Sequence, residues 1–354
     1  MNMKNLIIKW LISFVKLWQK PSDTPSFLIV STTGLGDSLW GTPALRALKE
    51  AHPHSYIGVL TSPIGAQVFK NNPHLNELFT LKNSSFLSFF SLYYKLKKKR
   101  FGTIFIFHTS QRFVLPFCFL LGAKKIVGTE GINKGLDFIL THPLKKEQTH
   151  EIARRLNIVN VPADKPFLEI FLTSEDKEIA REFLEKNSIP SYLPMIGLHP
   201  GAKDQFKQWP AEHFITLGKR LVDTVGCQIF VTGSSDERAL VERIAKEIPG
   251  AIPLAGELPI RPFAALLHKL HLFITNDTGP MHIAYAMNTP TVALFCPTSP
   301  KLCGPYLAPR VTVISKPPSC TPCLRKKCRD PFCLLQIGPD QVFKEALLKL
   351  GKTQ

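Results

Sequence analysis

The sequence predicts an α/β protein with two Rossmann-like domains that face a central cleft. The chain has 354 residues, and at about 150 residues per domain this length suits two domains. Short apolar strands alternate with helices in both halves, which indicates parallel sheets with crossover helices. Glycine-rich turns follow strands in each half, and ligands of such sheets bind at the carboxyl ends of the strands.

Composition and charge exclude several classes of protein. With 44% hydrophobic and 20% charged residues, the chain is not intrinsically disordered. It contains no uncharged apolar run of about 18 residues, the length that spans a bilayer. The net charge of +17 favours an anionic partner: nucleic acid, anionic lipid or a phosphorylated substrate.

The first domain is expected over residues 26–173. The apolar strand 27–30 leads into the turn STTGLGD at 31–37, and one helix then continues to about Lys49. Further strands are expected at 56–60, 103–107 and 125–128. A charged helix at 174–187, followed by Pro190 and Pro194, marks a linker.

The second domain is expected over residues 190–340, followed by a C-terminal helix over 341–354. It repeats the alternation of strands and helices, without an obvious repeat in sequence. The expected strands are 195–199, 228–232, 272–275 and 291–295, and the expected helices are 211–225, about 236–247, 262–268 and one from near Gly279.

Residues 1–20 predict an amphipathic helix on a membrane surface. Lys9, Ser13, Lys16 and Lys20 form a narrow polar stripe at helical spacing, and Leu, Ile, Phe and Trp cover the rest. This pattern suits a helix in the headgroup layer of an anionic membrane. The alternatives are a helix packed on the protein's own surface and a signal peptide. Lysines within the apolar region and the lack of a small-residue cleavage site disfavour the signal peptide.

Two further segments have open interpretations. The segment 84–100, SSFLSFFSLYYKLKKKR, is either a second membrane-contacting surface or the solvated end of a packed helix. Near the C-terminus, four cysteines have spacings that permit a tetrahedral zinc site, although free thiols are the alternative. These are Cys320, Cys323, Cys328 and Cys333. Without export the compartment is reducing, and disulfides are not expected.

Three motifs carry candidate chemistry. In the Gly34–Asp37 turn, Asp37 is either a general base or a carboxylate stabilised by the start of the helix. After His199-Pro-Gly-Ala, Lys207 is either a cation for phosphate or a surface lysine, and Trp209 is expected to pack. The segment Asn276–His282 follows a buried strand and opens a helix. It suits a diphosphate at a helix N-terminus, or an ordinary N-cap with a packed histidine.

In this order, the motifs resemble the lipopolysaccharide heptosyltransferases, glycosyltransferase family 9, over nearly the whole chain after residue 26. The resemblance implies a GT-B fold and inverting, metal-independent transfer of heptose from ADP-heptose. The implied acceptor is the inner core of lipid A-linked lipopolysaccharide, at the cytoplasmic face of the inner membrane. The segments that carry it are GLGDSLWGTPALRALKEAHP (34–53), LHPGAKDQFKQWPAEHF (198–214), VTGSSDERALVERIA (231–245), LAGELPIRPFAALL (254–267) and ITNDTGPMHIAYAMNTPTVALFCPTSP (274–300).

The resemblance also implies residue roles. Asp37 is the catalytic base, and Lys207 balances the charge on the leaving diphosphate. Glu237 is expected near the ribose. The remaining nucleotide-sugar site comprises Gly36, Gly201, Asp277, Thr278, Gly279 and His282.

Other functions remain open at this point. The segment 83–115 is unusually rich in Phe, Leu and Lys, which leaves the identity of the acceptor open. The identity of the donor sugar is open as well. A nucleotide-sugar epimerase would need no lipid acceptor. A basic nucleic-acid-binding protein with a cysteine-bound metal is the alternative from another class. We expect a nucleotide sugar, a lipid A-core acceptor and an anionic membrane surface as partners, no nucleic acid, and no cofactor apart from the zinc considered above.

Overall fold

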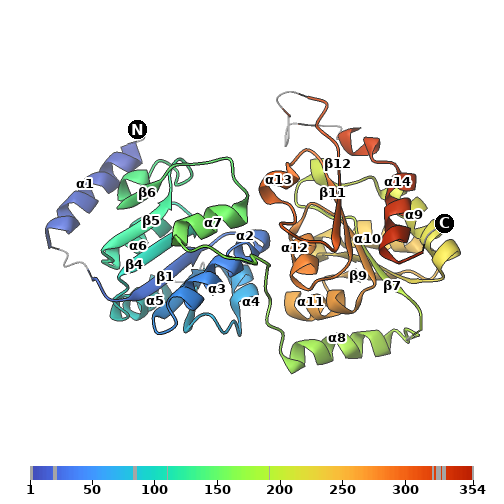
Figure 1. Ribbon diagram of the computed structural model, residues 1–354, viewed down its shortest axis with the longest axis horizontal. Coiled ribbons are helices and arrows are strands. Elements are labelled where there is room, and N and C mark those ends of the chain that lie inside the picture. Colours follow the sequence, from blue (N-terminus) through green and yellow to red (C-terminus); the bar gives the residue numbers. More distant parts are fainter. Residues whose placement is uncertain are drawn as a thin grey trace. The chain divides into compact units, whose positions relative to one another are not determined.

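The computed structural model divides the chain into two compact units (Figure 1). Unit 1 is Met1–Phe171 and unit 2 is Leu172–Gln354. The structure describes residues 3–18, 22–82, 86–109, 111–190, 192–320, 323, 328 and 332–352.

Unit 1 contains a six-stranded parallel sheet in the order β3-β2-β1-β4-β5-β6. Alternate side chains of its strands enter two separate cores, as the period of two requires. One core lies under α1, α5 and α6, and the other lies under α3 and α7. The elements are α1 (Met3–Trp18), β1 (Ser26–Ser31), α2 (Leu35–Leu39), α3 (Thr42–Ala51), β2 (Tyr56–Thr61), α4 (Pro63–Phe69), β3 (Glu77–Thr80), α5 (Phe86–Lys98), β4 (Thr103–His108), α6 (Val114–Leu120), β5 (Lys125–Thr129), β6 (His142–Leu144) and α7 (Glu151–Val159).

Unit 2 repeats the plan with a parallel sheet in the order β12-β11-β10-β7-β8-β9. Helices again cover both faces (Figure 1). The elements are α8 (Ser174–Lys186), β7 (Met195–His199), α9 (Ala211–Val225), β8 (Gln228–Gly233), α10 (Arg238–Glu247), β9 (Ile252–Ala255), α11 (Ile260–Lys269), β10 (Leu272–Asn276), α12 (Gly279–Ala286), β11 (Thr291–Phe295), α13 (Pro300–Cys303), β12 (Val311–Ser315) and α14 (Pro339–Lys349). The prediction of two Rossmann-like α/β halves is confirmed.

The helix α8 is part of unit 2, where it packs on α11. Arg261, 2% exposed in its side chain, donates from Nη2 to Asp176 Oδ2 at 2.8 Å. A capping box between Thr173 and Asp176 begins the helix. The predicted linker prolines therefore come after a helix that already belongs to the second unit.

Two predicted helices are wrong in their extent. The C-terminal helix expected over 341–354 is α14, which begins at Pro339 and ends at Lys349. The helix expected to continue to about Lys49 is two helices, α2 and α3, which are separated at Trp40 and Gly41. Pro43 has no N–H to donate to the carbonyl of Leu39, so a continuous helix would lose that bond. The hydroxyl of Thr42 donates to the Leu39 carbonyl at 2.9 Å instead.

The eight predicted strands are present with ends within one residue of those expected, whereas four strands were not predicted. These four strands, β3, β6, β9 and β12, are the outermost strands of the two sheets. All of them except β12 are short. An outermost strand has one neighbour and is less buried, so its sequence lacks the apolar run that marks an inner strand. No helix in the described ranges is both long and apolar enough to cross a membrane.

Candidate active site

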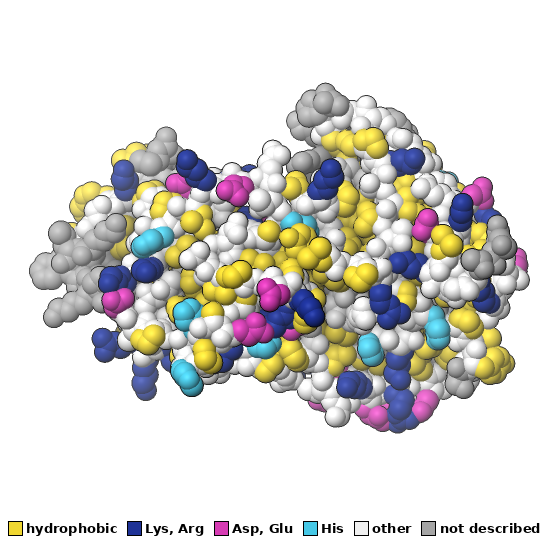
Figure 2. All heavy atoms as spheres, in the orientation of Figure 1, with side chains coloured by type: hydrophobic (Ala, Val, Ile, Leu, Met, Phe, Trp, Pro, Cys, Tyr) yellow, Lys and Arg dark blue, Asp and Glu magenta, His cyan; other side chains and the backbone are white. Residues whose placement is uncertain are grey.

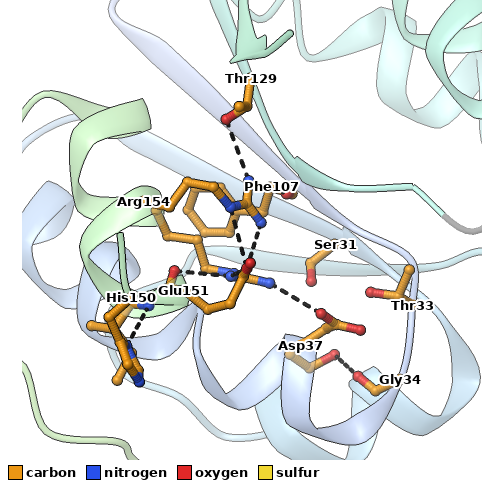
Figure 3. A network of polar contacts seen from close by, with 12 residues as sticks. Ser31, Thr33, Gly34, Asp37, Phe107, Thr129, His150, Glu151 and Arg154 are labelled. Atoms are coloured by element: carbon orange, nitrogen blue, oxygen red, sulfur yellow. Dashed lines mark hydrogen bonds and ion pairs between the residues drawn. The ribbon is translucent and has the colours of Figure 1, made fainter. Parts of the chain in front are cut away.

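In unit 1, Asp37 lies where β1 ends and α2 begins (Figure 3). Gly34 is the N-cap residue of α2, and its carbonyl accepts hydrogen bonds from the N–H and the hydroxyl of Ser38, at 3.1 and 3.0 Å. Asp37 occupies the first turn, where the helix dipole favours a carboxylate. Its side chain remains 27% exposed, so the carboxylate is open to a ligand.

One oxygen of Asp37 is held by an arginine from α7. Arg155 Nη2 lies 3.3 Å from Asp37 Oδ1, and the Arg155 side chain is fully buried. Arg155 Nη1 donates to the carbonyl of Glu151 at 2.9 Å and also to its carboxylate. The guanidinium lies over the ring of Trp40, 5.4 Å from its centroid. Arg155 therefore fixes the carboxylate through one oxygen only.

Glu151 and Arg154 complete this group of charges (Figure 3). Arg154 donates to Glu151 Oε2 at 2.7 Å and to the carbonyl of Phe107, at the end of β4, at 3.0 Å. Burial by itself would raise the pKa of Glu151, but Arg155 and Arg154 outweigh burial and lower it to about 2. Two carboxylates thus face two guanidinium groups at the carboxyl ends of β1 and β4.

The sequence alone does not reveal this group. Its only local signal is the spacing of Glu151 three and four residues before Arg154 and Arg155, which is typical of any solvated helix with ion pairs.

His108 ends β4 at the same edge. Burial lowers its pKa, while Asp37 acts in the opposite direction and Arg155 adds to the lowering, so the imidazole is neutral near pH 7. Its Nδ1 and the hydroxyl oxygens of Ser31 and Thr33 are buried and accept or donate no hydrogen bond within the described residues. Buried polar atoms normally have partners, so this edge offers hydrogen-bonding groups to a ligand.

In unit 2, Lys207 and Asp277 form an ion pair at the carboxyl end of β10. Lys207 Nζ lies 2.6 Å from Asp277 Oδ2, and the two side chains are 20% and 7% exposed. The hydroxyl of Thr298, which follows β11, donates to the same Asp277 oxygen at 2.5 Å. Lys207 is therefore not an ordinary surface lysine.

Asn276 connects the loop of Lys207 to the ends of β7 and β10. Its Oδ1 accepts from the N–H of Trp209 at 3.1 Å, and its Nδ2 donates to the carbonyl of Pro200 at 2.8 Å. Trp209 is 1% exposed and donates from its indole N–H to the Ile337 carbonyl at 2.8 Å. The prediction that Trp209 packs in the core is confirmed.

The segment after Asp277 opens α12, with Thr278 as N-cap residue and Gly279 as the first helical residue. The Thr278 side chain does not cap the helix, and its hydroxyl oxygen is buried with no hydrogen bond to a described residue. His282 is buried in α12 at 3% exposure. A helix start with an uncommitted hydroxyl and a lysine beside it suits a phosphate group.

Glu237 lies beside Gly201 at the ends of β7 and β8. A capping box joins Ser234 and Glu237. A Cβ at Gly201 would lie 2.1 Å from a Glu237 carboxylate oxygen, so only glycine fits there without moving Glu237. His199, at the end of β7, is buried, and burial lowers its pKa to about 4. Its Nδ1 lies 3.0 Å from the Thr232 hydroxyl, and the neutral ring is a structural part of this edge.

The structure thus collects the predicted residues at two edges. Gly36 and Asp37 lie at the carboxyl edge of the sheet in unit 1. At the carboxyl edge of the sheet in unit 2 lie Gly201, Lys207, Glu237, Asp277, Thr278 and Gly279, with His282 one turn into α12.

The zinc site that the cysteine spacings permit receives no support from the structure. Cys320, Cys323, Cys328 and Cys333 are all of intermediate burial. Among the residues that the structure describes, which include all four cysteines, no group of three or more His, Cys, Asp or Glu side chains is placed to hold a metal ion. The sulfur of Cys333 instead accepts from the N–H of Ser319 at 3.3 Å.

Comparison with known proteins identifies the family of the chain. Residues 96–332 match the model of glycosyltransferase family 9 (heptosyltransferase). Lipooligosaccharide heptosyltransferase 2 of Haemophilus influenzae is 24% identical over 310 residues, which cover 82% of this chain and 88% of that protein.

Solved structures share the fold. Escherichia coli ADP-heptose lps heptosyltransferase II superposes with a TM-score of 0.75 at 21% identity, over 92% of this chain and 98% of that one. E. coli heptosyltransferase WaaC with ADP-2-deoxy-2-fluoro heptose gives 0.66 at 19% identity, over 90% and 97%. The fold is therefore GT-B, as expected. The chain belongs to glycosyltransferase family 9, the heptosyltransferases.

Proposed function

We propose that this enzyme transfers heptose from ADP-heptose to the inner core of lipid A-linked lipopolysaccharide, with inversion and without a metal ion. The observation that carries the proposal is the pairing of Lys207 with Asp277 beside the start of α12. A cation next to helix N–H groups is suited to the diphosphate that leaves in the reaction. The name of the WaaC structure, which records an ADP-heptose analogue bound to that protein, supports the choice of donor.

The donor would bind along the carboxyl edge of unit 2. The diphosphate would accept hydrogen bonds from the N–H groups at the start of α12 and from the Thr278 hydroxyl, which has no other partner among the described residues. Lys207, already held in this loop by Asp277, would balance the negative charge that grows on the leaving phosphate. The carboxylate of Glu237 would accept hydrogen bonds from the ribose hydroxyls.

Asp37 would act as the general base for the acceptor. Arg155 holds Oδ1, so Oδ2 takes the proton as the acceptor hydroxyl oxygen attacks the anomeric carbon. The new C–O bond forms on the face opposite the bond to the β-phosphate. That bond breaks, ADP leaves, and the configuration inverts. Ser31, Thr33 and His108, with buried polar atoms at the same edge, would orient the acceptor sugar.

We further propose that the enzyme works as a peripheral protein at the cytoplasmic face of the inner membrane, because its acceptor is a lipid and its net charge is +17. A related nucleotide sugar or a different lipid-linked acceptor is the second candidate, since the roles proposed above for the site residues concern a diphosphate and a ribose but no particular sugar. A nucleic-acid-binding function would leave Asp37, Lys207 and Asp277 without a role.

The test is a transfer assay with the purified full-length chain. Acceptor lipid lacking heptose is incubated with ADP-heptose, ADP-glucose or UDP-N-acetylglucosamine, with and without EDTA. The mass of the glycolipid product is then measured by mass spectrometry. We expect a heptose-extended glycolipid with ADP-heptose only, and no effect of EDTA. Transfer of another sugar would replace the donor assignment. Conversion of a nucleotide sugar without acceptor would refute transfer in favour of epimerisation.

A further inference from the structure

Three helices of unit 1 form one continuous layer over one face of its sheet. Residues of α1, α5 and α6 enter the same core. Phe89 of α5 packs against Phe113 and Phe117 at ring-centroid distances of 5.7 and 4.9 Å, and Lys97 donates to the carbonyl of Leu120 at the end of α6 at 2.9 Å. The outer side of these helices is called the α1–α5–α6 face below.

The helix α1 is a fixed part of this layer. Asn5 is 4% exposed, donates from Nδ2 to the Gly135 carbonyl at 3.1 Å, and accepts from Arg112. Ile12 is 6% exposed, and Ile8 packs against the same core. Asn5, Ile8 and Ile12 lie on one side of a helix, so α1 docks through this stripe and turns its other sides outward.

The outward sides are strongly apolar. Of the 17 large hydrophobic side chains that are exposed among the described residues, 10 belong to the α1–α5–α6 face. Trp10 and Phe14 stack on each other there, with ring centroids 6.3 Å apart. Figure 2 shows hydrophobic side chains over α1, with Lys and Arg side chains beside them. The ten are Met3, Leu6, Ile7, Trp10, Leu11, Phe14, Phe90, Tyr94, Phe113 and Leu120.

The helices of this face come from strongly basic stretches of the chain, in which Lys99 and Lys124 pair with Glu77 and Asp23, two carboxylates that lie just outside the stretches. The stretches 1–22 and 78–129, from which all three helices come, contain 13 Lys and Arg and no Asp or Glu, and they account for most of the +17 of the chain. Lys4, Lys9, Lys95, Lys98 and Arg100 are exposed. Exposed apolar patches of this kind mark interaction sites, and lysines beside a membrane-inserted apolar face are attracted to anionic lipid headgroups.

We propose that the α1–α5–α6 face is one rigid docking surface for an anionic phospholipid bilayer. This proposal assigns the membrane location in the proposed function to a definite surface. The surface itself is inferred from the exposure and charge of its side chains alone. Because Asn5, Ile8 and Ile12 fix α1, the helix is not a flexible tether, and α5 and α6 contribute to binding together with it. A second copy of the chain is a poor occupant, because two faces this basic would repel each other.

The test is flotation of the full chain with vesicles of phosphatidylcholine alone or with about one-third phosphatidylglycerol, without donor or acceptor. One variant carries Leu6→Ser, Trp10→Ser and Phe14→Ser. A second carries Phe90→Ser, Phe113→Ser and Leu120→Ser. The matched control carries Leu307→Ser, Leu335→Ser and Leu348→Ser, which replace side chains of similar exposure in unit 2. Circular dichroism and size-exclusion chromatography with light scattering report fold and oligomeric state.

We expect the wild type and the control to bind only the anionic vesicles well. Each of the first two variants should lose about a hundredfold in partition coefficient, and Lys95→Gln with Lys98→Gln should lose about fivefold per lysine. Loss in the first variant alone would overturn the composite surface in favour of a tether. Unchanged binding in both variants, or a wild-type dimer that both variants convert to monomer, would overturn the bilayer assignment. A failed transfer assay would leave this result unaffected, because no substrate is used here.

Discussion

Replacement of Glu151 by glutamine tests the charged group around Asp37 most directly. The Glu151 carboxylate accepts from both Arg154 and Arg155, and its side chain is 30% exposed while that of Arg155 is fully buried. In Glu151→Gln, two guanidinium groups keep only Asp37 as a nearby anion. Loss of one partner from a buried ion pair leaves an uncompensated charge, so the variant should be less stable and should hold Asp37 less firmly.

The magnitude follows from the pKa of Glu151, which the two arginines lower from 4.5 to about 2 against the opposing effect of burial. A group with a lowered pKa in the folded state stabilises the fold above its unfolded pKa and loses that contribution as pH falls toward the folded value. The shift corresponds to about 3 kcal/mol at pH 7 and to about 2 kcal/mol at pH 3.5. The stability difference between wild type and Glu151→Gln should therefore be largest above about pH 4.5 and should shrink in acid.

Both proteins are unfolded with urea at pH 7 and at pH 3.5. Unfolding is measured by hydrogen exchange of the backbone amides in β4 and β5, so that unit 1 is followed separately from unit 2. The control is Asp23→Asn, which breaks a solvent-exposed pair with Lys124 in the same unit and should have no measurable effect. A difference below about 1 kcal/mol at pH 7, or one that grows as the pH falls, would refute the role assigned to Glu151.

Three further predictions concern the proposed reaction. Asp37→Asn should lower turnover by ~10²–10⁴ with little change in donor affinity, measured by single-turnover kinetics and ADP-heptose titration; near wild-type turnover would remove Asp37 from the mechanism. Lys207→Ala should weaken ADP-heptose binding and slow transfer by ~10²–10³, with EDTA harmless in the wild type; loss of wild-type activity in EDTA would contradict the metal-free account. Gly201→Ala should push aside Glu237, whose carboxylate lies 2.1 Å from the added Cβ, and reduce donor affinity about tenfold while Tm stays nearly unchanged. An unaltered affinity in calorimetry would separate Glu237 from the nucleotide.

The sequence was sufficient for the architecture and for much of the candidate site. Inner strands such as 195–199 and 291–295 are short apolar runs whose burial on both faces leaves a pattern in the residues themselves. Lys207, Glu237 and Asp277 each follow such a strand, and the carboxyl ends of parallel strands meet at one edge. Their convergence within unit 2 could therefore be predicted without coordinates.

Other features depended on packing between segments that are distant in sequence. Arg155 reaches Asp37 across 118 positions, and its pairing with Glu151 looks in sequence like any ion pair on a solvated helix. In α1, the lysine stripe can be recognised from the sequence. The stripe that packs on the rest of unit 1 consists of Asn5, Ile8 and Ile12, and Asn5 is held there by the carbonyls of the 134–135 turn and by Arg112. The spacing of residues in the sequence shows which of them share one face of a helix. Which face is buried depends on the surface that the rest of the chain builds against it, and only the tertiary structure contains that information.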